Sequence, residues 1–393
     1  MSDAGEAAGR RRLAAMHARL VDWLVGSALP LWARRGVDAV TGGFVECLAQ
    51  DGTVPGVARR ARVPARQIFV FAQAPRFGWK GDAAGIVARG LEEFVLRHRR
   101  PDGLFRTLVA CDGSVLSDDA LLYDQAFALL AFAAAATLGD PQGCEAAALA
   151  LRKRIEVCFG TAEGAFRASE QADAADDSRE ANPHMHLLEA CQAWARIGAD
   201  PGWSMWSHRL TDLALCRFAR LPSGAFGEIF THDWRPAPGP AGSRIEPGHQ
   251  FEWAWLLLRQ TPAAAVAHQT ALRLQAIGEG YGIVRGAVVD AWDADLAVAR
   301  ASARLWPQTE RLKAALAIAA GADQDRAWSI AADAAESLLP YLATPMAGLW
   351  FDRRTAEGAY PATPAPASSL YHLVGAIAEL DAAAGSRRFS EMR

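Results

Sequence analysis

Polar and aromatic side chains gather in six short clusters, each at the expected start of a helix. Histidines occur in three of them, and because the imidazole ring titrates near neutral pH it can accept and return a proton. Glutamates and an arginine accompany the histidines, and these can orient an imidazole or stabilise developing negative charge. The set is suited to proton transfer. The clusters are Arg66-Gln67, Tyr123-Asp124-Gln125, Asn182 to His186, Glu246 to Glu252, Trp306 to Glu310 and Pro366 to His372.

Helical spacing indicates which of these side chains point the same way, because residues three or four apart share one face of a helix. Free amide donors and partial positive charge at helix N-termini would also favour an anionic intermediate where several such helices start together. The pairs that share a face are His249 with Glu252, Asn182 with His186, and Trp306 with Glu310.

A repeated unit positions the clusters. A turn glycine followed by apolar or aromatic residues recurs about every 55 to 70 residues, which is typical of a repeat architecture. The segments between these glycines are rich in Ala and Leu, with apolar residues at i, i+3 and i+4, so each unit is predicted to hold two helices. The marker glycines are Gly43, Gly103, Gly164, Gly224, Gly280 and Gly348.

Twelve helices in six hairpins predict an all-α chain folded as an (α/α)6 barrel, a closed ring that buries one face of every helix. Short strand-like connections join the hairpins, and a two-domain helical protein is the alternative. We expect one catalytic domain over 1–393, with a frayed tail over 385–393. The Pro- and Gly-rich loop 231–243 is too irregular for a helix and could cover a site. The expected helices are 10–28, 64–79, 82–99, 119–138, 141–157, 181–197, 201–219, 247–260, 263–277, 303–320, 324–342 and 366–384.

Composition excludes several partners. The chain has 41 basic and 44 acidic residues, so no broad charge recruits nucleic acid or an anionic membrane. The longest uncharged run, 125–139, is shorter than the roughly 20 residues needed to span a bilayer. The six cysteines form no C-x-x-C pair, which favours a reduced, cytoplasmic compartment. We therefore expect a small-molecule substrate and a monomer or homodimer.

The ordered motifs ARQIFVF, LLYDQAF, NPHMHLLEA, EPGHQFEW, RLWPQTE and PASSLYHL closely resemble the N-acylglucosamine 2-epimerase superfamily, which includes mannose isomerases and cellobiose 2-epimerases. The match runs from about residue 40 to 380. The resemblance implies an (α/α)6 barrel that acts without a redox cofactor or a metal. By motif position it places the paired catalytic histidines on His249 and His372. The substrate-binding or supporting residues it implies are Arg66, Tyr123, Asn182, His186, Glu252, Trp306 and Glu310.

Moving hydrogen between neighbouring sugar carbons requires removing a proton beside a carbonyl, and a base with a near-neutral pKa does this reversibly. We hypothesise that one histidine helps to open the sugar ring and transfers a proton, while the other exchanges the C2 proton through a cis-enediolate. Arg66 would stabilise the enediolate oxygen, and Glu252 or Glu310 would orient an imidazole.

Several residues have competing interpretations. His184 lies two residues from His186 and so faces elsewhere, which leaves a structural role open. Tyr371 is either core or site. A zinc site built from His186, His249, Glu252 and His372 is chemically acceptable, but no local spacing enforces it.

The substrate also stays open. Mannose–fructose isomerisation is the preferred activity, and 2-epimerisation, for example between mannose and glucose, shares the enediolate. The basic segment Arg59, Arg60 and Arg62 leaves a phosphorylated sugar such as mannose 6-phosphate open. Glycoside hydrolysis by Glu252 and Glu310 is a different class. A binding module is a third, because the superfamily contains a protein named for binding renin.

Overall fold

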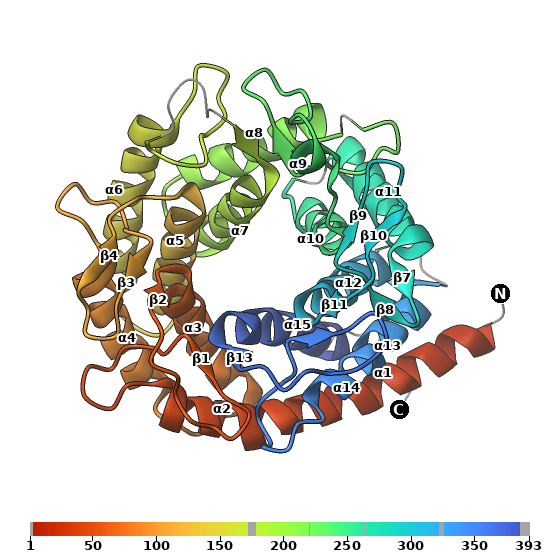
Figure 1. Cartoon of the computed structure of the whole chain (residues 1–393), viewed down its shortest axis with the longest axis horizontal. Helices are drawn as coiled ribbons and strands as arrows, with labels where there is room; N and C mark the ends of the chain where they lie inside the picture. The colour runs from red at the N-terminus through yellow and green to blue at the C-terminus, as the bar shows by residue number, and fades with distance from the viewer. Residues whose placement is uncertain (1–2, 172–177, 220, 263, 322–325, 386–393) are drawn as a thin grey trace.

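The computed structural model describes residues 3–171, 178–219, 221–262, 264–321 and 326–385. In this part of the chain the helices form two concentric rings, and Figure 1 shows them closing around a central axis. The inner helices are α3 (Arg62–Gln73), α5 (Leu122–Ala136), α7 (Ala181–Ile197), α10 (Pro247–Leu258), α12 (Leu305–Ala319) and α15 (Ala367–Gly385). The outer helices are α1 (Asp3–Trp23), α4 (Ala83–His98), α6 (Pro141–Phe159), α8 (Gly202–Arg217), α11 (Ala265–Tyr281) and α13 (Ala327–Ser337).

The inner ring closes because α15 packs against both α12 and α3, and each inner helix also packs on an outer one. An inner helix therefore has neighbours on most of its faces, and α5 is buried along nearly its whole length. Its many alanines let the surrounding helices approach closely. This architecture is the predicted (α/α)6 barrel.

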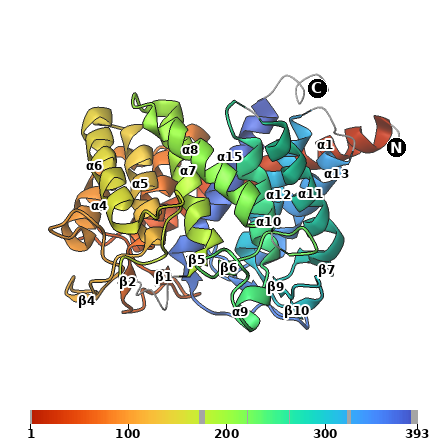
Figure 2. The same cartoon turned by 90° about the horizontal axis from the view of Figure 1, so that it is seen from above.

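Short antiparallel strand pairs lie together at one end of the barrel, where Figure 2 shows them below the helices. Several strands lead directly into inner helices, so the inner N-termini open at this end. The strands are β1 (Cys47–Leu48), β2 (Arg59–Arg60), β3 (Leu108–Val109), β4 (Val115–Ser117), β5 (Arg179–Glu180), β6 (Ile229–Phe230), β7 (Ile283–Val284), β8 (Ala287–Val288), β9 (Ala291–Trp292), β10 (Val298–Arg300), β11 (Ala303–Arg304), β12 (Arg353–Arg354) and β13 (Ala365–Pro366).

One side-chain contact recurs at the start of the inner helices. The Gln125 amide accepts a hydrogen bond from the Phe105 N–H at 2.8 Å and donates one to the Phe105 carbonyl, also at 2.8 Å. Gln250 makes the same pair of bonds with Phe226, and Gln308 makes it with Val288. Each of these glutamines joins an inner helix to the segment just after a left-handed glycine, at Gly103, Gly224 or Gly286, and this shared contact accounts for the repeat.

Two marker glycines were assigned wrongly. Gly280 lies inside α11, and the left-handed turn of that unit is at Gly286, with φ of 78°. In the first unit Gly42, with φ of 76°, takes the left-handed position instead of Gly43. Only glycine adopts this backbone without strain. The helical pattern continued through Gly280, so a glycine alone did not identify the turn.

The first helix is longer than the expected 10–28. Helical backbone runs from Asp3 to Gly36 through α1, a π-helical segment Leu24–Ala28, α2 (Leu29–Leu31) and a second π-helical segment Trp32–Gly36. Pro30 cannot donate the usual backbone bond, and wider π turns on either side carry the chain past it.

Four short helices complete the described elements, and one of them corrects a prediction. The loop 231–243 was expected to be irregular throughout, but α9 (Pro240–Ser243) forms one turn at its end. The loop is anchored by Trp234, which is buried against Phe218 and Phe230. The others are the 3-10 helix Ala74–Phe77, α2 and α14 (Leu339–Leu342).

The main hydrophobic core is one contiguous cluster from Leu13 to Leu380. That continuity favours a single domain, which stays a prediction. The frayed tail was expected over 385–393, but Gly385 is the last residue of α15, and 386–393 lie outside the described residues. Among the described helices none is long and apolar enough to cross a membrane.

Candidate active site

Side chains of the inner helices are layered from the strand-bearing mouth inward. Tyr123, Asn182, His249 and Trp306 lie in the first helical turn. Arg66, His186, Glu252, Glu310 and His372 lie in the second turn. Three residues along a helix correspond to a depth of about 4.5 Å. All nine residues expected from the sequence therefore come from the same end of the barrel.

The two candidate catalytic histidines flank one indole. The Trp306 ring centroid lies 5.1 Å from that of His249 and 5.6 Å from that of His372. Both imidazoles are buried, with exposed fractions of 7% and 6%. Trp306 thus places two proton-transfer groups beside the same apolar surface.

His249 is held by a carboxylate that the sequence argument did not identify. Its Nδ1 lies 2.8 Å from Glu228 Oε2, and a carboxylate partner fixes the proton on that nitrogen. Burial lowers the pKa of His249, but the carboxylates of Glu228, Glu246 and Glu252 outweigh it and raise the pKa to about 9. His249 is therefore protonated at neutral pH.

Glu228 makes a second contact that recurs between units, in which a carboxylate accepts a hydrogen bond from a backbone N–H near the start of an inner helix. It lies two residues after the aromatic Phe226, and its Oε1 accepts from the Glu246 N–H at the start of α10. Glu46 and Asp290 occupy the same place in their units and accept from the N–H of Arg60 and Arg304. An acid two residues after the phenylalanine that follows a marker glycine was visible in the sequence at Glu46 and Glu228, and this signal would have found Glu228.

The charges around His372 shift its pKa in the direction opposite to that of His249. Its Nδ1 lies 2.8 Å from Glu310 Oε1, which leaves Nε2 as the nitrogen able to accept a proton. Burial, Arg66 and Lys313 hold the pKa of His372 well below its usual range. The ring is therefore neutral at neutral pH. Of the two proposed orienting glutamates, Glu310 contacts an imidazole in this way, whereas Glu228 takes that place at His249.

Arg66 points into an aromatic setting. Its guanidinium donates to the Tyr123 hydroxyl at 2.7 Å and lies 4.2 Å from the Phe127 ring centroid. Its Nε is buried and has no hydrogen-bond partner among the described residues. The arginine therefore keeps a donor available to an oxygen atom brought into the site.

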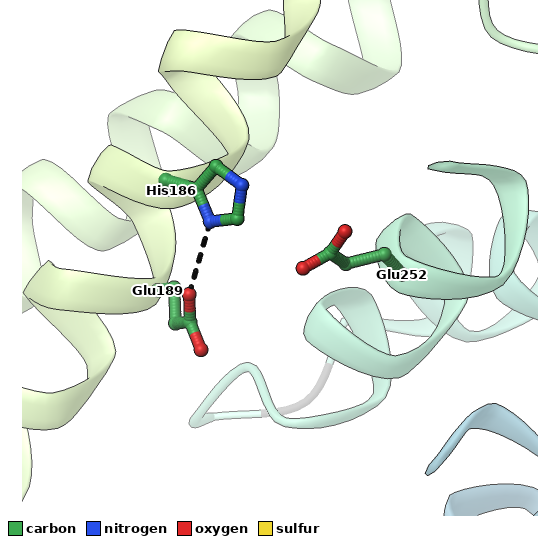
Figure 3. Close-up of side chains that lie close together, drawn as sticks. All are labelled: His186, Glu189 and Glu252. Carbon is green, nitrogen blue, oxygen red and sulfur yellow. Dashed lines mark hydrogen bonds and ion pairs between the residues drawn. The ribbon is translucent and has the colours of Figure 1, made fainter. Parts of the chain in front are cut away.

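His186 and Glu252 face each other from α7 and α10, as Figure 3 shows. His186 Nδ1 lies 3.1 Å from Glu189 Oε2, and Glu189 also accepts from the Tyr371 hydroxyl. Burial lowers the pKa of His186 to about 4. The sequence did not lead us to Glu189 or to this role of Tyr371. Helical spacing was a usable signal for Glu189, because it lies three residues after His186 and shares its helix face.

Among the buried acceptor atoms that have no hydrogen-bond partner in the described part of the chain are Oε1 of Glu252 and Oδ1 of Asn182. Burial and the nearby Glu310 raise the pKa of Glu252 well above its usual range. A buried acceptor without a hydrogen-bond partner lowers the stability of the folded protein. At the mouth of the barrel they can instead receive the hydroxyl groups of a polar ligand.

Among the described residues, two groups of potential metal-binding atoms share Glu252, and within each the atoms lie within 4.8 Å of one another. One joins Glu252 to His186 and Glu189, and the other joins it to Glu310 and His372. In the second, Glu310 already contacts His372 and the Lys313 ammonium, so a cation there would face a resident positive charge. His249 belongs to neither group, unlike in the zinc set considered from the sequence.

His184 is structural. Its Nε2 accepts from the Phe166 N–H at 3.1 Å, and its Nδ1 donates to the Glu180 carbonyl at 2.6 Å. These bonds require a neutral ring, and burial lowers its pKa to about 4. His184 thus accepts a hydrogen bond from the backbone N–H of Phe166, as Gln125, Gln250 and Gln308 accept one from the matching N–H in their units.

Comparison with known proteins identifies the family. The sequence model of the family described as N-acylglucosamine 2-epimerase (GlcNAc 2-epimerase) matches residues 42–376. A protein of Rhizobium meliloti (strain 1021) named mannose-6-phosphate isomerase is 42% identical over 373 residues, covering 92% of this chain and 96% of the relative. A D-mannose isomerase of Pseudomonas cannabina pv. alisalensis is 34% identical over 155 residues, 36% of each chain.

Solved structures share the fold. A crystal structure of D-mannose isomerase superposes with a TM-score of 0.83 at 20% identity, covering 97% of this chain and 98% of that one. Cellobiose 2-epimerase from Bacillus thermoamylovorans B4167 superposes with a TM-score of 0.84 at 17% identity, covering 94% and 99%. At these identities the likeness establishes the barrel and not the substrate. The family match extends over most of the chain, so this protein belongs to the N-acylglucosamine 2-epimerase family and is a carbohydrate isomerase or epimerase.

Proposed function

We propose that the chain is an aldose–ketose isomerase that interconverts D-mannose and D-fructose through a cis-enediolate. The observation that carries this proposal is the pair of imidazoles beside Trp306, each with its Nδ1 against a carboxylate and with its pKa shifted in the opposite direction from the other. A neutral base and a protonated acid, both held by carboxylates, are the two groups that reversible proton transfer requires.

In the proposed cycle, His249 donates a proton to the ring oxygen as the C1–O5 bond breaks, and it takes up the proton that the C1 hydroxyl loses as C1 becomes the aldehyde. Neutral His372 then takes the C2 proton on Nε2, and Arg66 stabilises the negative oxygen on C1. His372 returns the proton to C1 while the hydroxyl proton on O2 passes to O1, which leaves a ketone at C2. The same two side chains run the reaction in reverse.

The remaining site residues are proposed to hold the sugar or to support these groups. Asn182 Oδ1 and Glu252 Oε1 are unpaired acceptors suited to hydroxyl groups. Tyr123 and His186 complete the wall next to Arg66, with their ring centroids 5.1 Å apart. Trp306 offers an apolar face to the sugar carbons, and Glu310 orients His372.

An unphosphorylated hexose is the proposed substrate because the basic segment beside the mouth is already neutralised. Arg59 lies 3.2 Å from Asp38, Arg60 contacts Glu46, and Arg62 lies 2.9 Å from the fully buried Asp124. A phosphate would have to compete with these carboxylates. The relative named D-mannose isomerase also supports an unphosphorylated sugar.

Mannose 6-phosphate is the second candidate, because the 42% identical relative carries the name mannose-6-phosphate isomerase. Comparing kcat/KM for mannose and mannose 6-phosphate decides between them. We expect mannose to be preferred. A preference for the phosphate ester that disappears in Arg60→Met would instead assign Arg60 to the phosphate.

Incubating the purified protein with D-mannose in heavy water and following the products by proton NMR tests the activity. We expect fructose that has incorporated deuterium. Glucose deuterated at C2 would establish a 2-epimerase instead, which shares the enediolate. A lack of product from mannose, with turnover of another sugar, would refute the proposed substrate.

We further propose that the reaction uses no metal or other cofactor and that the partner is a monosaccharide rather than nucleic acid or a membrane. The described Cys residues are free thiols, which favours a cytoplasmic location. A monomer or homodimer is proposed, and sedimentation at working concentration distinguishes the two.

A further inference from the structure

A lysine lies one helical turn below the proposed reaction layer. Lys313 is in the third turn of α12, three residues after Glu310, and its side chain is 2% exposed. Its Nζ lies 2.6 Å from Glu310 Oε2 and 3.7 Å from the Trp255 ring centroid. A buried ammonium is unfavourable unless it is paired, so this contact is a built feature of the core.

Glu310 connects Lys313 to His372. The carboxylate is fully buried, with one oxygen facing Lys313 and the other facing His372 Nδ1. A neutral glutamic acid would present a proton on one of these oxygens and weaken one of the two contacts. The orientation of His372 therefore depends on the charge of Glu310.

We propose that Lys313 is a positioning residue: it keeps Glu310 ionised, and ionised Glu310 holds the His372 proton on Nδ1 so that Nε2 accepts the sugar proton. This inference rests on the proposed role of His372. It adds a residue that the sequence motifs did not indicate.

The groups around Lys313 come from four inner helices. Besides Glu310 on α12, the carboxylates of Glu252 on α10 and Glu189 on α7 act on its ammonium. Burial lowers the pKa of Lys313, but these three carboxylates outweigh it and raise the pKa above its usual value. On α15 lie His372 and Tyr371, whose hydroxyl donates to Glu189. Arg66 and His186 also act on His372.

Lys313 acts from outside the sugar site. It lines a cavity of about 230 Å³ together with Trp255, Arg259, Gln192 and Gly375. The other charged side chains lining this cavity are Arg76, Arg196, Glu189 and Glu379. None of the proposed sugar-contacting residues lines the cavity, so Lys313 reaches the reaction through Glu310 and is not expected to touch the sugar.

Replacing Lys313 by methionine tests the proposal, because Met keeps the length and removes the charge. Without the cation, the His372–Glu310 pair holds an extra proton up to a higher pH, whichever of the two carries it. We expect the acid limb of the kcat/KM profile to move upward by about one pH unit or more, as for loss of a close charge. We also expect kcat to fall by about 10- to 100-fold. Lys313→Arg should restore the limb.

The matched control is Arg259→Met. Arg259 lies 4.6 Å from the same Trp255 ring and lines the same cavity, but its carboxylate partner is Glu379, outside the reaction layer. We expect an unchanged acid limb and kcat within about twofold, because such a pair contributes little. Equal effects of the two substitutions would mean that Lys313 only supports packing, and would overturn the proposal.

A readout without substrate separates this inference from the proposed function. Titrating the His372 ring by NMR in wild type and Lys313→Met, with His372→Asn for assignment, should show protonation of the His372–Glu310 pair at higher pH in the variant. An unchanged titration overturns the inference even if mannose is turned over. A shifted titration in a protein that does not isomerise mannose supports the coupling and refutes the proposed function. If Lys313→Met does not fold, Lys313→Gln, which is neutral but can donate to Glu310, replaces it in both measurements.

Discussion

His249 and His372 lie against the same indole ring, yet the charges around them differ in sign. Glu228, Glu246 and Glu252 surround His249, whereas Arg66 and Lys313 act on His372. Each ring has a carboxylate on Nδ1, so that contact alone does not set the protonation state. The wider surroundings assign the acid and the base, and residues outside the motifs contribute to the difference.

Replacing either histidine should have the largest effect on turnover, because it removes the acid or the base altogether. We expect His372→Asn and His249→Asn each to lower kcat by about 100- to 10,000-fold, the range for loss of a general acid or base. Circular dichroism and the unfolding midpoint check that the fold is retained. Wild-type turnover in both variants would refute the proposed mechanism.

Glu228→Gln should change the pH dependence of the acid without removing it. Glu228 raises the pKa of His249, so the substitution lowers this pKa. The reaction needs protonated His249, and the basic limb of the kcat/KM profile should therefore move to lower pH by about one unit or more. Glu156→Gln, at an exposed ion pair with Arg209, is the control. A basic limb that does not move would place the acid elsewhere.

His184 and His186 provide a second comparison within one helix, between a structural ring and a ring of the site. His184→Ala leaves the Phe166 N–H without its partner and removes the ring's bond to the Glu180 carbonyl, and should lower the free energy of unfolding by about 1–3 kcal/mol. His184→Gln should restore most of it, because glutamine fills this place in three other units. Turnover at 25 °C should stay near wild type in both. A large loss of kcat in folded His184→Gln would give His184 a role in the site.

The same residue predicts a pH effect on stability. The pKa of folded His184 is about 4, below the usual 6.5, so unfolding is coupled to proton uptake. The stabilisation from its neutral ring is complete above pH 6.5 and is lost as the pH falls toward 4. Chemical denaturation between these values should show a smaller decline in His184→Gln. An identical decline would assign the effect to other groups.

The smallest expected effect is that of chelation. The Lys313 ammonium already pairs with Glu310 in the set formed by Glu252, Glu310 and His372, so a divalent cation is not required there. Turnover after exhaustive dialysis against a chelator should equal that of untreated protein. Loss of activity that returns with added metal would contradict this and reopen the groups around Glu252.

The fold was predictable because the barrel repeats one unit. Apolar helical periodicity and a cluster at each inner helix start are local signals, and they indicated helices within a few residues of α4, α7 and α12. Failures occurred where tertiary packing overrode local signals. Gly280 is an ordinary helical glycine, and π turns continue the first helix past Pro30.

The site was predictable at the level of helix starts, because spacing places His249, Glu252 and Glu310 on inward faces. The partners of these residues were harder to infer, because Glu228 and His249 meet only when a loop packs on α10. Lys313 needed the fold as well: its role depends on Glu310 on the preceding turn and on His372 from α15. Charge states in such a core arise from several helices at once.

The most direct test of the division between acid and base is the loss of deuterium from D-[2-²H]mannose to solvent, measured in His372→Asn and His249→Asn. We predict no detectable release from His372→Asn, because the base that takes the C2 hydron is gone. His249→Asn should still release deuterium from the open-chain sugar, at a reduced rate. Release by His372→Asn together with none by His249→Asn would reverse the two assignments and contradict the account.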